Sequence, residues 1–154
     1  MNCTAALHQI EVAMETIIQI IGTLSEEDIL KRPTADKHSI GELLEHLAVI
    51  CEADRRIAQE ATQTEMEEFY TGVSYKTLAS IKAGLLTNFK ALKNEYLNLS
   101  EEELKQETTS YWGVTYTRYE WLLEILAHIY HHRGQLHAML VHCYQQDPNI
   151  LLFE

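Results

Sequence analysis

The sequence predicts an all-α protein, a four-helix bundle. Four segments place apolar residues at the three- and four-residue spacings of an amphipathic helix, and residues that can cap a helix stand at the start of two of these segments. With 154 residues, of which 46% are hydrophobic, the chain is long enough to bury a substantial core. We therefore expect a single domain over residues 1–154.

The first helix is predicted over residues 4–21, where the apolar side chains form one stripe and Gly22 follows as a stop signal. Ser25 can cap a short helical turn after it. The second long helix opens with a capping box, in which the side chains of Ser39 and Glu42 each satisfy a free backbone amide of the first turn.

Residues 59–74 lose this apolar pattern and are predicted to be a connection. A dozen extended residues reach up to roughly 40 Å, so the helices on either side of the connection could run parallel to each other. The third helix is predicted over residues 75–99, and the pair Ser100 and Glu103 looks like a second capping box that opens a single turn.

Residues 107–117 favour extended structure or an ordered loop, and they lead into a fourth helix predicted to reach about Tyr144. The aromatic stretch from Tyr111 to Tyr116 has two interpretations, the wall or lid of a pocket and a loop that seals the end of the bundle. The short apolar tail at residues 150–153 is expected to pack on the bundle or on a second subunit.

Two histidines of the fourth helix form the strongest functional signal. His128 and His132 are four residues apart on the apolar face, roughly 6 Å along the helix axis, which allows both rings to bind one divalent ion. The alternative is a pair of core histidines hydrogen-bonded to their neighbours. A metal site needs a third ligand, and His46 is the other histidine predicted to face the core within a helix. Cys143 and His142 lie too far along the helix to join the pair.

Two carboxylates lie near these positions. Glu124, four residues before His128, is a candidate catalytic residue, either as a general base or as a hydrogen-bond acceptor for an imidazole N–H, and the alternative is an acid that faces solvent. Asp54 maps to the apolar face of the second helix, and we interpret it as a surface acid where that helix leaves the core.

The residues around His132 have packing roles in our interpretation. His131 is expected to form a hydrogen bond at a helix contact or, as an alternative, to line a pocket. Arg133 and Gln135 are expected to fix helix packing or a dimer contact. Gly134, which is unfavourable inside a helix, predicts the close approach of another helix.

Composition excludes several classes of protein. The net charge is −11 and no cluster of basic residues is denser than Arg55 and Arg56, which argues against nucleic-acid binding. Three scattered cysteines do not form a disulfide framework and are expected to be reduced. No apolar run approaches the roughly 20 residues of a membrane span, and no signal peptide is visible, so we expect a cytoplasmic protein that is not bound to a membrane.

Two segments resemble one known family. Ser39-Ile-Gly-Glu-Leu-Leu-Glu-His46-Leu and Glu124-Ile-Leu-Ala-His128-Ile-Tyr-His-His132-Arg-Gly-Gln are similar to the DinB/YfiT-like superfamily, and the similarity extends over nearly the whole chain. The resemblance implies a four-helix bundle with an up-down-down-up course, often a homodimer, that binds a divalent metal through three histidines. Matched by position, these are His46, His128 and His132, the same three that helical geometry selects.

The resemblance also implies a function. Relatives in this family are thiol-dependent S-transferases and isomerases that use bacillithiol, mycothiol or glutathione, so a metal-activated thiolate, or water, acting on a small-molecule substrate is the leading hypothesis, with Zn or Ni as the expected metal. The alternatives are a metal-dependent hydrolase, a stress-associated metal-binding or interaction protein without turnover, and a purely structural bundle. Since the net charge does not attract an anionic thiol, local help from Arg55, Arg56 or Arg118 would be needed. The family's Gly-containing C-terminal tail is replaced here by Tyr144-Gln-Gln-Asp-Pro148.

Overall fold

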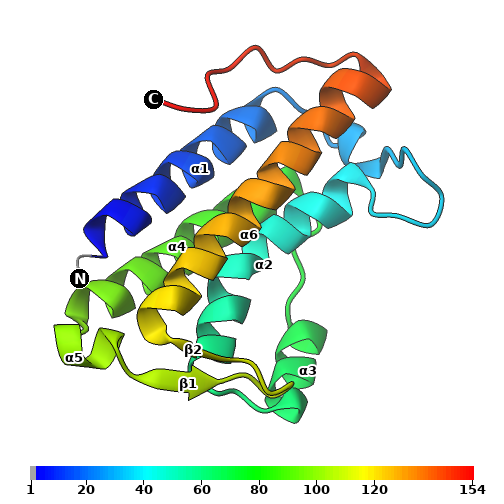
Figure 1. The fold of residues 1–154 in the computed structure, drawn as a ribbon. Helices are drawn as coiled ribbons and strands as arrows, with labels where there is room; N and C mark the ends of the chain where they lie inside the picture. The colour runs from blue at the N-terminus through cyan, green and yellow to red at the C-terminus, as the bar shows by residue number, and fades with distance from the viewer. Residues whose placement is uncertain (1–2) are drawn as a thin grey trace.

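The computed structural model describes residues 3–154, and helices dominate it (Figure 1). The four long helices are α1 (Thr4–Gly22), α2 (Ile40–Ala58), α4 (Leu78–Asn98) and α6 (Arg118–Ala138). The shorter elements are the 3-10 turn η1 (Asp28–Leu30), α3 (Gln63–Gly72), α5 (Glu101–Leu104), the strands β1 (Glu107–Thr109) and β2 (Thr115–Thr117), and the π-helical turn η2 (Met139–Cys143). The predicted all-α fold is confirmed. Within the described residues, no helix has both the length and the apolar character needed to cross a membrane.

Each long helix packs against two others, α1 against α4 and α6, and α2 against the same pair. Two side-chain contacts between α2 and α4 give their relative direction. Asn88 donates to the backbone carbonyl of Ala48 at 2.7 Å, and Arg55 pairs with Glu95 at 2.7 Å. A later residue of α2 therefore contacts a later residue of α4. The two helices therefore run parallel, and Figure 1 shows α1 and α6 running the opposite way.

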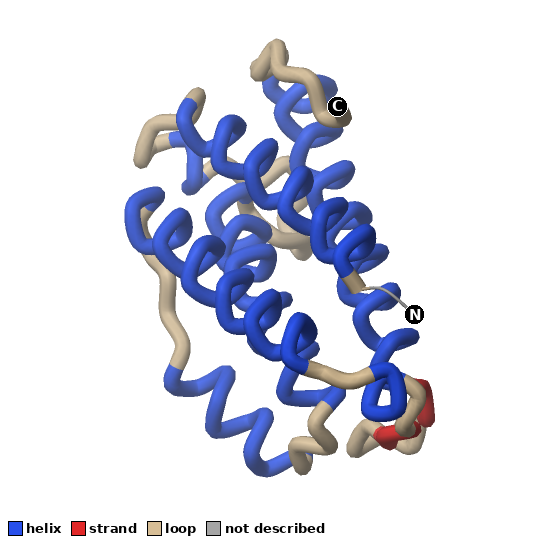
Figure 2. Tube along the Cα trace, turned by 90° about the vertical axis from the view of Figure 1, so that its left-hand side faces the viewer, coloured by secondary structure: helices blue, strands red, loops and turns tan. Residues whose placement is uncertain are grey.

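The parallel course of α2 and α4 requires a long connection, and this connection contains a helix. Residues 59–74 are part of this connection, as predicted, but they are not extended throughout, because α3 occupies Gln63–Gly72. Thr62 and Glu65 form a capping box at its start, and Met66 is its one buried residue. Figure 2 shows α3 outside the bundle near one end, followed by an extended segment that leads back to the start of α4.

A small hairpin closes the same end of the molecule. Strands β1 and β2 pair in antiparallel register, with Thr108 opposite Tyr116, and the preceding turn α5 has the predicted capping box of Ser100 and Glu103. A second hydrophobic cluster, separate from the main core, joins α2, α3 and α6 beneath this hairpin. Its buried members are Ala53, Ile57, Ala58, Met66 and Trp121.

Two glycines mark close approaches of the chain. A Cβ atom at Gly41 would lie 2.8 Å from the carbonyl oxygen of Ile29, and one at Gly84 would lie 2.7 Å from the ring of Tyr75. Tyr75 itself precedes α4, which begins three residues later than predicted because Thr77 caps it. At Gly134 no atom other than those of its chain neighbours and its own helix backbone lies within 4 Å of such a Cβ, so the predicted close approach of a helix there is wrong.

Arg133 fixes the packing of α6, as its position suggested. The guanidinium is buried, donates to Thr16 Oγ1 on α1 at 2.9 Å, and donates to the carbonyl of Leu152 at 2.7 Å. It also stacks on the rings of Tyr130 and Phe153, at 4.3 and 4.8 Å from the centroids. The C-terminal tail is thereby held against the bundle.

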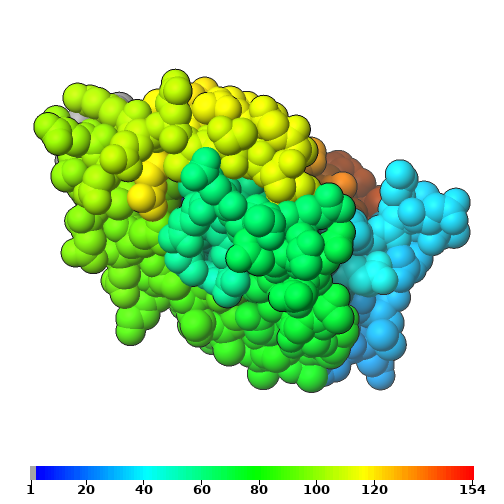
Figure 3. Space-filling view, turned by 90° about the horizontal axis from the view of Figure 1, so that it is seen from below, coloured from blue at the N-terminus to red at the C-terminus, as the bar shows by residue number. Residues whose placement is uncertain are grey.

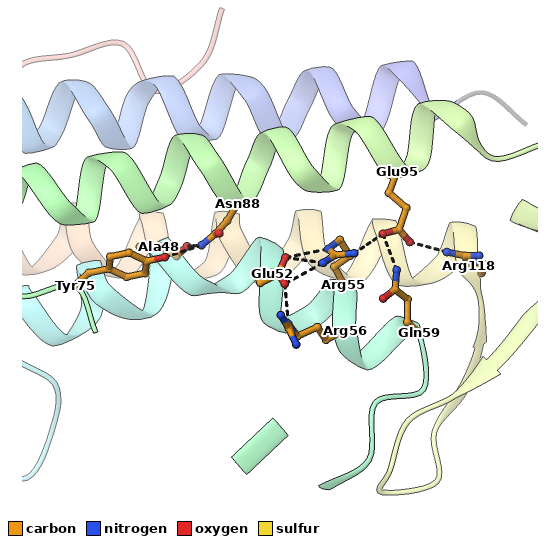
Figure 4. Close-up of polar contacts among 9 residues, drawn as sticks. All are labelled: Ala48, Glu52, Arg55, Arg56, Gln59, Tyr75, Asn88, Glu95 and Arg118. Carbon is orange, nitrogen blue, oxygen red and sulfur yellow. Dashed lines mark hydrogen bonds and ion pairs between the residues drawn. The ribbon is translucent and has the colours of Figure 1, made fainter. Parts of the chain in front are cut away.

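A network of ion pairs centred on Glu95 joins α2, α4 and the start of α6 (Figure 4). The Glu95 carboxylate accepts hydrogen bonds from Arg55 at 2.7 Å, Arg118 at 2.6 Å and Gln59 at 2.7 Å. Arg55 also pairs with Glu52 on its own helix at 2.9 Å. Because the Glu95 side chain is only 16% exposed, solvent screens these interactions weakly.

We expect Glu95→Gln to lower the free energy of unfolding by about 2 kcal/mol, because Arg55 and Arg118 lose their shared counter-charge in a poorly solvated place. The matched control is Glu11→Gln, whose ion pair with Lys93 is more than a third exposed and should matter by about 0.5 kcal/mol or less. Urea unfolding of both variants measures the difference. Equal losses would show that the network contributes no more than a surface ion pair.

Asp28 anchors the segment that leads into α2. Its carboxylate accepts hydrogen bonds from the backbone amide of Ser25 at 2.7 Å, from Lys31 at 2.6 Å and from Gln146 at 3.2 Å. The hydrogen bond from Lys31, followed by that from Ser25, holds the pKa of Asp28 well below its usual range. The C-terminal segment and the loop before α2 therefore meet at one charged group.

Asp28→Asn should destabilise the protein by about 1–2 kcal/mol at neutral pH. Since the folded-state pKa is depressed, the stabilisation is fully present above the unfolded-state pKa of about 3.9 and is lost as pH falls through the lower folded-state value. The difference between wild type and variant should thus shrink in acid, as measured by denaturant unfolding at several pH values. Asp36→Asn, in the exposed part of the same loop, should have no such pH-dependent effect.

Candidate metal centre

The structure brings His46 of α2 together with His128 and His132 of α6. The Nε2 atom of His46 lies 3.3 Å from Nε2 of His128 and 3.1 Å from Nε2 of His132. The ligand atoms of all three residues lie within 4.8 Å of one another, and each residue is partly buried. Among the described residues, this is the one cluster of metal-ligating side chains with such a geometry.

These separations agree with those of ligands on a single ion. Imidazole nitrogens bind zinc at about 2.0–2.1 Å, so two nitrogens that subtend an angle between 90° and the tetrahedral angle at the ion are about 2.8–3.4 Å apart. Both measured Nε2 distances from His46 fall in this range. The three histidines could therefore hold one metal ion.

Hydrogen bonds on the far side of two rings determine which nitrogen carries the proton. His128 donates from Nδ1 to Asp54 Oδ2 at 2.7 Å, and His132 donates from Nδ1 to Gln135 Oε1 at 2.9 Å. In the neutral rings, both Nε2 atoms then present lone pairs toward His46. A proton on His46 Nε2 can satisfy only one of them, whereas a cation at the centre satisfies all three nitrogens.

The local electrostatics favour neutral rings at two of the three positions. Burial, together with the neighbouring His132 and His128, lowers the pKa of His46 to about 4. Burial also lowers the pKa of His132. By contrast, the hydrogen bond to Asp54 raises the pKa of His128, so this carboxylate favours positive charge on that side of the cluster. Neutral imidazoles beside a carboxylate suit a divalent ion.

Sequence reasoning missed two of these supporting residues. Asp54 was interpreted as a surface acid, which is wrong, since its side chain is 15% exposed and is bonded to His128. Gln135 was assigned to helix packing or a dimer contact, but its side chain orients His132. The position of Asp54, eight residues after His46 on the same face of α2, could have indicated that it lies near the histidines.

Two cavities flank the cluster. The larger, about 780 Å³, is a groove beside His46 between the loop before α2 and α3, and Figure 3 shows these walls in blue and green. Its charged lining comprises Arg32, Asp36, Lys37, His38, Glu42, Glu45 and His46. The smaller cavity, about 240 Å³, is beside His128, and Tyr70 lines both. The cluster is therefore open to small molecules from two sides.

Other residues singled out in the sequence have distinct places. Glu124 lines the smaller cavity with His128, and Tyr111 does so as well, which makes the aromatic stretch a pocket wall. His131 is exposed, and its ring lies 4.8 Å from that of His132.

The three arginines expected to help an anionic thiol do not line either cavity beside the cluster, because they serve other contacts. Arg55 and Arg118 belong to the Glu95 network, and Arg56 pairs with Glu52 and stacks on Phe69. The basic side chains of the larger cavity are instead Arg32 and Lys37.

A family model described as the DinB superfamily matches residues 9–136. The chain belongs to the DinB superfamily. A crystal structure of a candidate DinB family member from Exiguobacterium sibiricum is 34% identical, with a TM-score of 0.84 over 97% of this chain and 95% of that one. A DinB-like protein from Bacillus subtilis has the same fold, with a TM-score of 0.66 at 16% identity over 86% of this chain and 87% of that one. No curated protein is significantly similar to the chain.

Proposed function

We propose that this DinB protein binds one divalent metal ion, Zn or Ni, through Nε2 of His46, His128 and His132, and that it is a metal-dependent transferase acting on a low-molecular-weight thiol. The observation that carries the proposal is the convergence of three Nε2 atoms, two of them on rings whose Nδ1 atoms are hydrogen-bonded to Asp54 and Gln135. Three protein ligands leave further coordination positions for a substrate, as in catalytic sites.

When bound, such an ion supplies Lewis acidity, which lowers the pKa of a thiol or water and polarises a carbonyl group. The chain's own residues position the reactants. Asp54 and Gln135 hold the His128 and His132 rings in one tautomer, and the packing of α2 against α6 sets the third ring.

The larger cavity, although Asp36, Glu42 and Glu45 also line it, offers donors to a thiol that carries carboxylates. Arg32 is held by a two-pronged hydrogen bond to Glu42, with both distances 2.8 Å, so its charge is largely compensated. Lys37 and His38 are exposed on the same wall and offer donors for a carboxylate. On the other side of the cluster, we assign proton transfer to Glu124, whose pKa is raised by partial desolvation and by the charge of Asp54.

The test begins with elemental analysis of untagged protein, since a histidine tag would bind metal itself. We expect close to one Zn or Ni per chain, and a fall in melting temperature after chelation because the ion stabilises only the folded state. The metal-loaded protein is then assayed for conjugation of glutathione, bacillithiol or mycothiol to 1-chloro-2,4-dinitrobenzene. The rate should disappear on chelation and return with metal.

Each outcome decides one part of the proposal. A metal-free protein whose melting temperature does not respond to added Zn or Ni overturns the metal site and the enzyme together. A bound ion without turnover of any of the three thiols overturns the transferase assignment and leaves metal binding. Metal-dependent breakdown of an ester substrate without thiol would indicate the hydrolase alternative.

A further inference from the structure

The smaller cavity beside His128 has an unusual lining. It is made by α2, α3, the hairpin and α6, which lie far apart in the sequence. Its aromatic walls are Tyr70, Tyr111, Trp112 and Trp121. The remaining lining residues are Ile57, Asp54, Glu124 and His128. Aromatic rings thus surround a small space, about 240 Å³, that also contains two carboxylates.

The hairpin holds its two aromatic side chains in a defined place. The Ser110 amide donates to the Val114 carbonyl at 2.8 Å, and the buried Ser110 hydroxyl accepts from the Val114 amide at 3.1 Å. Gly113 has φ of +93°, a conformation that permits the tight turn. Within this turn the rings of Tyr111 and Trp112 meet edge to face, with centroids 4.8 Å apart.

These aromatic rings remain accessible although burial would be favourable. Tyr70, Tyr111 and Trp112 are 48%, 46% and 51% exposed. All three residues line the cavity, and protein covers only about half of each. Exposed aromatic groups fixed around a cavity favour ligand contact over a purely structural role.

Two carboxylates, Asp54 and Glu124, line this cavity together with His128. Neither Lys nor Arg is among its lining residues. The Asp54 carboxylate accepts the hydrogen bond from His128, whereas no hydrogen bond or ion pair to the Glu124 carboxylate is found within residues 3–154. Glu124 therefore offers an uncompensated negative charge beside aromatic rings.

We propose that this cavity binds an organic cation, a primary or quaternary ammonium group, with its charge against Glu124 and its alkyl groups against Tyr70, Tyr111 and Trp112. Aromatic faces attract cations through the ring quadrupole, and a carboxylate adds Coulomb attraction. The two carboxylates disfavour an anion there. The larger cavity, by contrast, is lined by the basic groups of Arg32 and Lys37 as well as by carboxylates, so it presents groups of both charges.

The site goes beyond the proposed metal function, and its binding can be measured without activity. The probes are choline and 3,3-dimethylbutan-1-ol, which have the same shape and differ in charge. The chain has two tryptophans, Trp112 and Trp121, and both line this cavity, so intrinsic fluorescence reports on it directly. Calorimetry gives the affinity, for protein as isolated and again after chelation.

We expect saturable binding of choline and binding of the neutral isostere that is about tenfold weaker, a difference in line with cation–π and carboxylate contacts. Trp112→Ala and Glu124→Gln should each weaken choline binding about tenfold while the melting temperature stays near that of wild type, because both side chains are exposed. Glu120→Gln, an exposed acid one turn earlier on α6, should leave binding unchanged.

Three results would overturn the proposal. The first is equal affinity for choline and its neutral isostere. The second is an equal loss of choline affinity in Glu120→Gln and Glu124→Gln. The third is the absence of binding for choline, tetramethylammonium and butylammonium alike. Because the cation titration is repeated on metal-free protein, failure of the metal site leaves this test intact.

Discussion

Replacing His46 with alanine is expected to lower the affinity for Zn or Ni by about a hundredfold or more. Loss of a ligand should lower the metal affinity by more than the 10–100-fold that is typical when a residue hydrogen-bonded to a ligand is lost. The physical reason is that His46 supplies a nitrogen that lies within 3.3 Å of both other ligand atoms. Titration of metal-free protein in competition with a chromophoric chelator measures the change.

The control for this variant is His137→Ala, five residues after His132 on the same helix and outside the cluster. It should bind metal like wild type, and the melting temperature of both metal-free variants should confirm that they fold. Wild-type affinity in His46→Ala would refute a three-histidine site that includes α2. An equal loss in the control would indicate nonspecific binding by histidines.

Asp54→Asn should weaken metal binding about tenfold, and Asp54→Ala between about tenfold and a hundredfold. Asparagine can still accept the His128 Nδ1–H through its carbonyl oxygen, so it keeps the ring orientation and loses the negative charge. Alanine loses both. The same competition titration applies, and the imidazole N–H resonance of His128 in NMR should shift in both variants.

Glu124→Gln is the matched control, because Glu124 lines the same cavity as His128 without a hydrogen bond to its ring. Its metal affinity should remain within about threefold of wild type, while Asp54→Ala falls by at least about tenfold. The opposite ranking would mean that Glu124, as the sequence suggested, is the carboxylate that supports the imidazole.

The sequence predicts the fold well where apolar periodicity and capping residues agree. The stripe of α1 and the capping box of Ser39 and Glu42 locate two long helices to within a residue or two. The helix α3 was missed because Met66 is its one buried residue, so no apolar stripe exists to detect. Its capping box, Thr62 with Glu65, was present in the sequence and was the usable signal.

The candidate site, like the fold, could be predicted only in part from the sequence. The spacing of His128 and His132 places two rings on one helix face, and helix geometry needs no tertiary information to do so. The partners of those rings could not be found by spacing alone. Asp54 reaches His128 only because α2 and α6 run antiparallel, and Gln135 required knowledge of the side-chain rotamers.

The separate hydrophobic cluster beneath the hairpin has a consequence for the entry of a substrate that is larger than either cavity. Its five buried residues join α3 and the start of α6 to the end of α2, apart from the main core of the bundle. Such a small unit opens at a lower free energy than global unfolding. We therefore expect amide exchange in α3 and the hairpin to be faster than in the four long helices, a difference that would let the walls around His128 separate while the three histidines keep their positions.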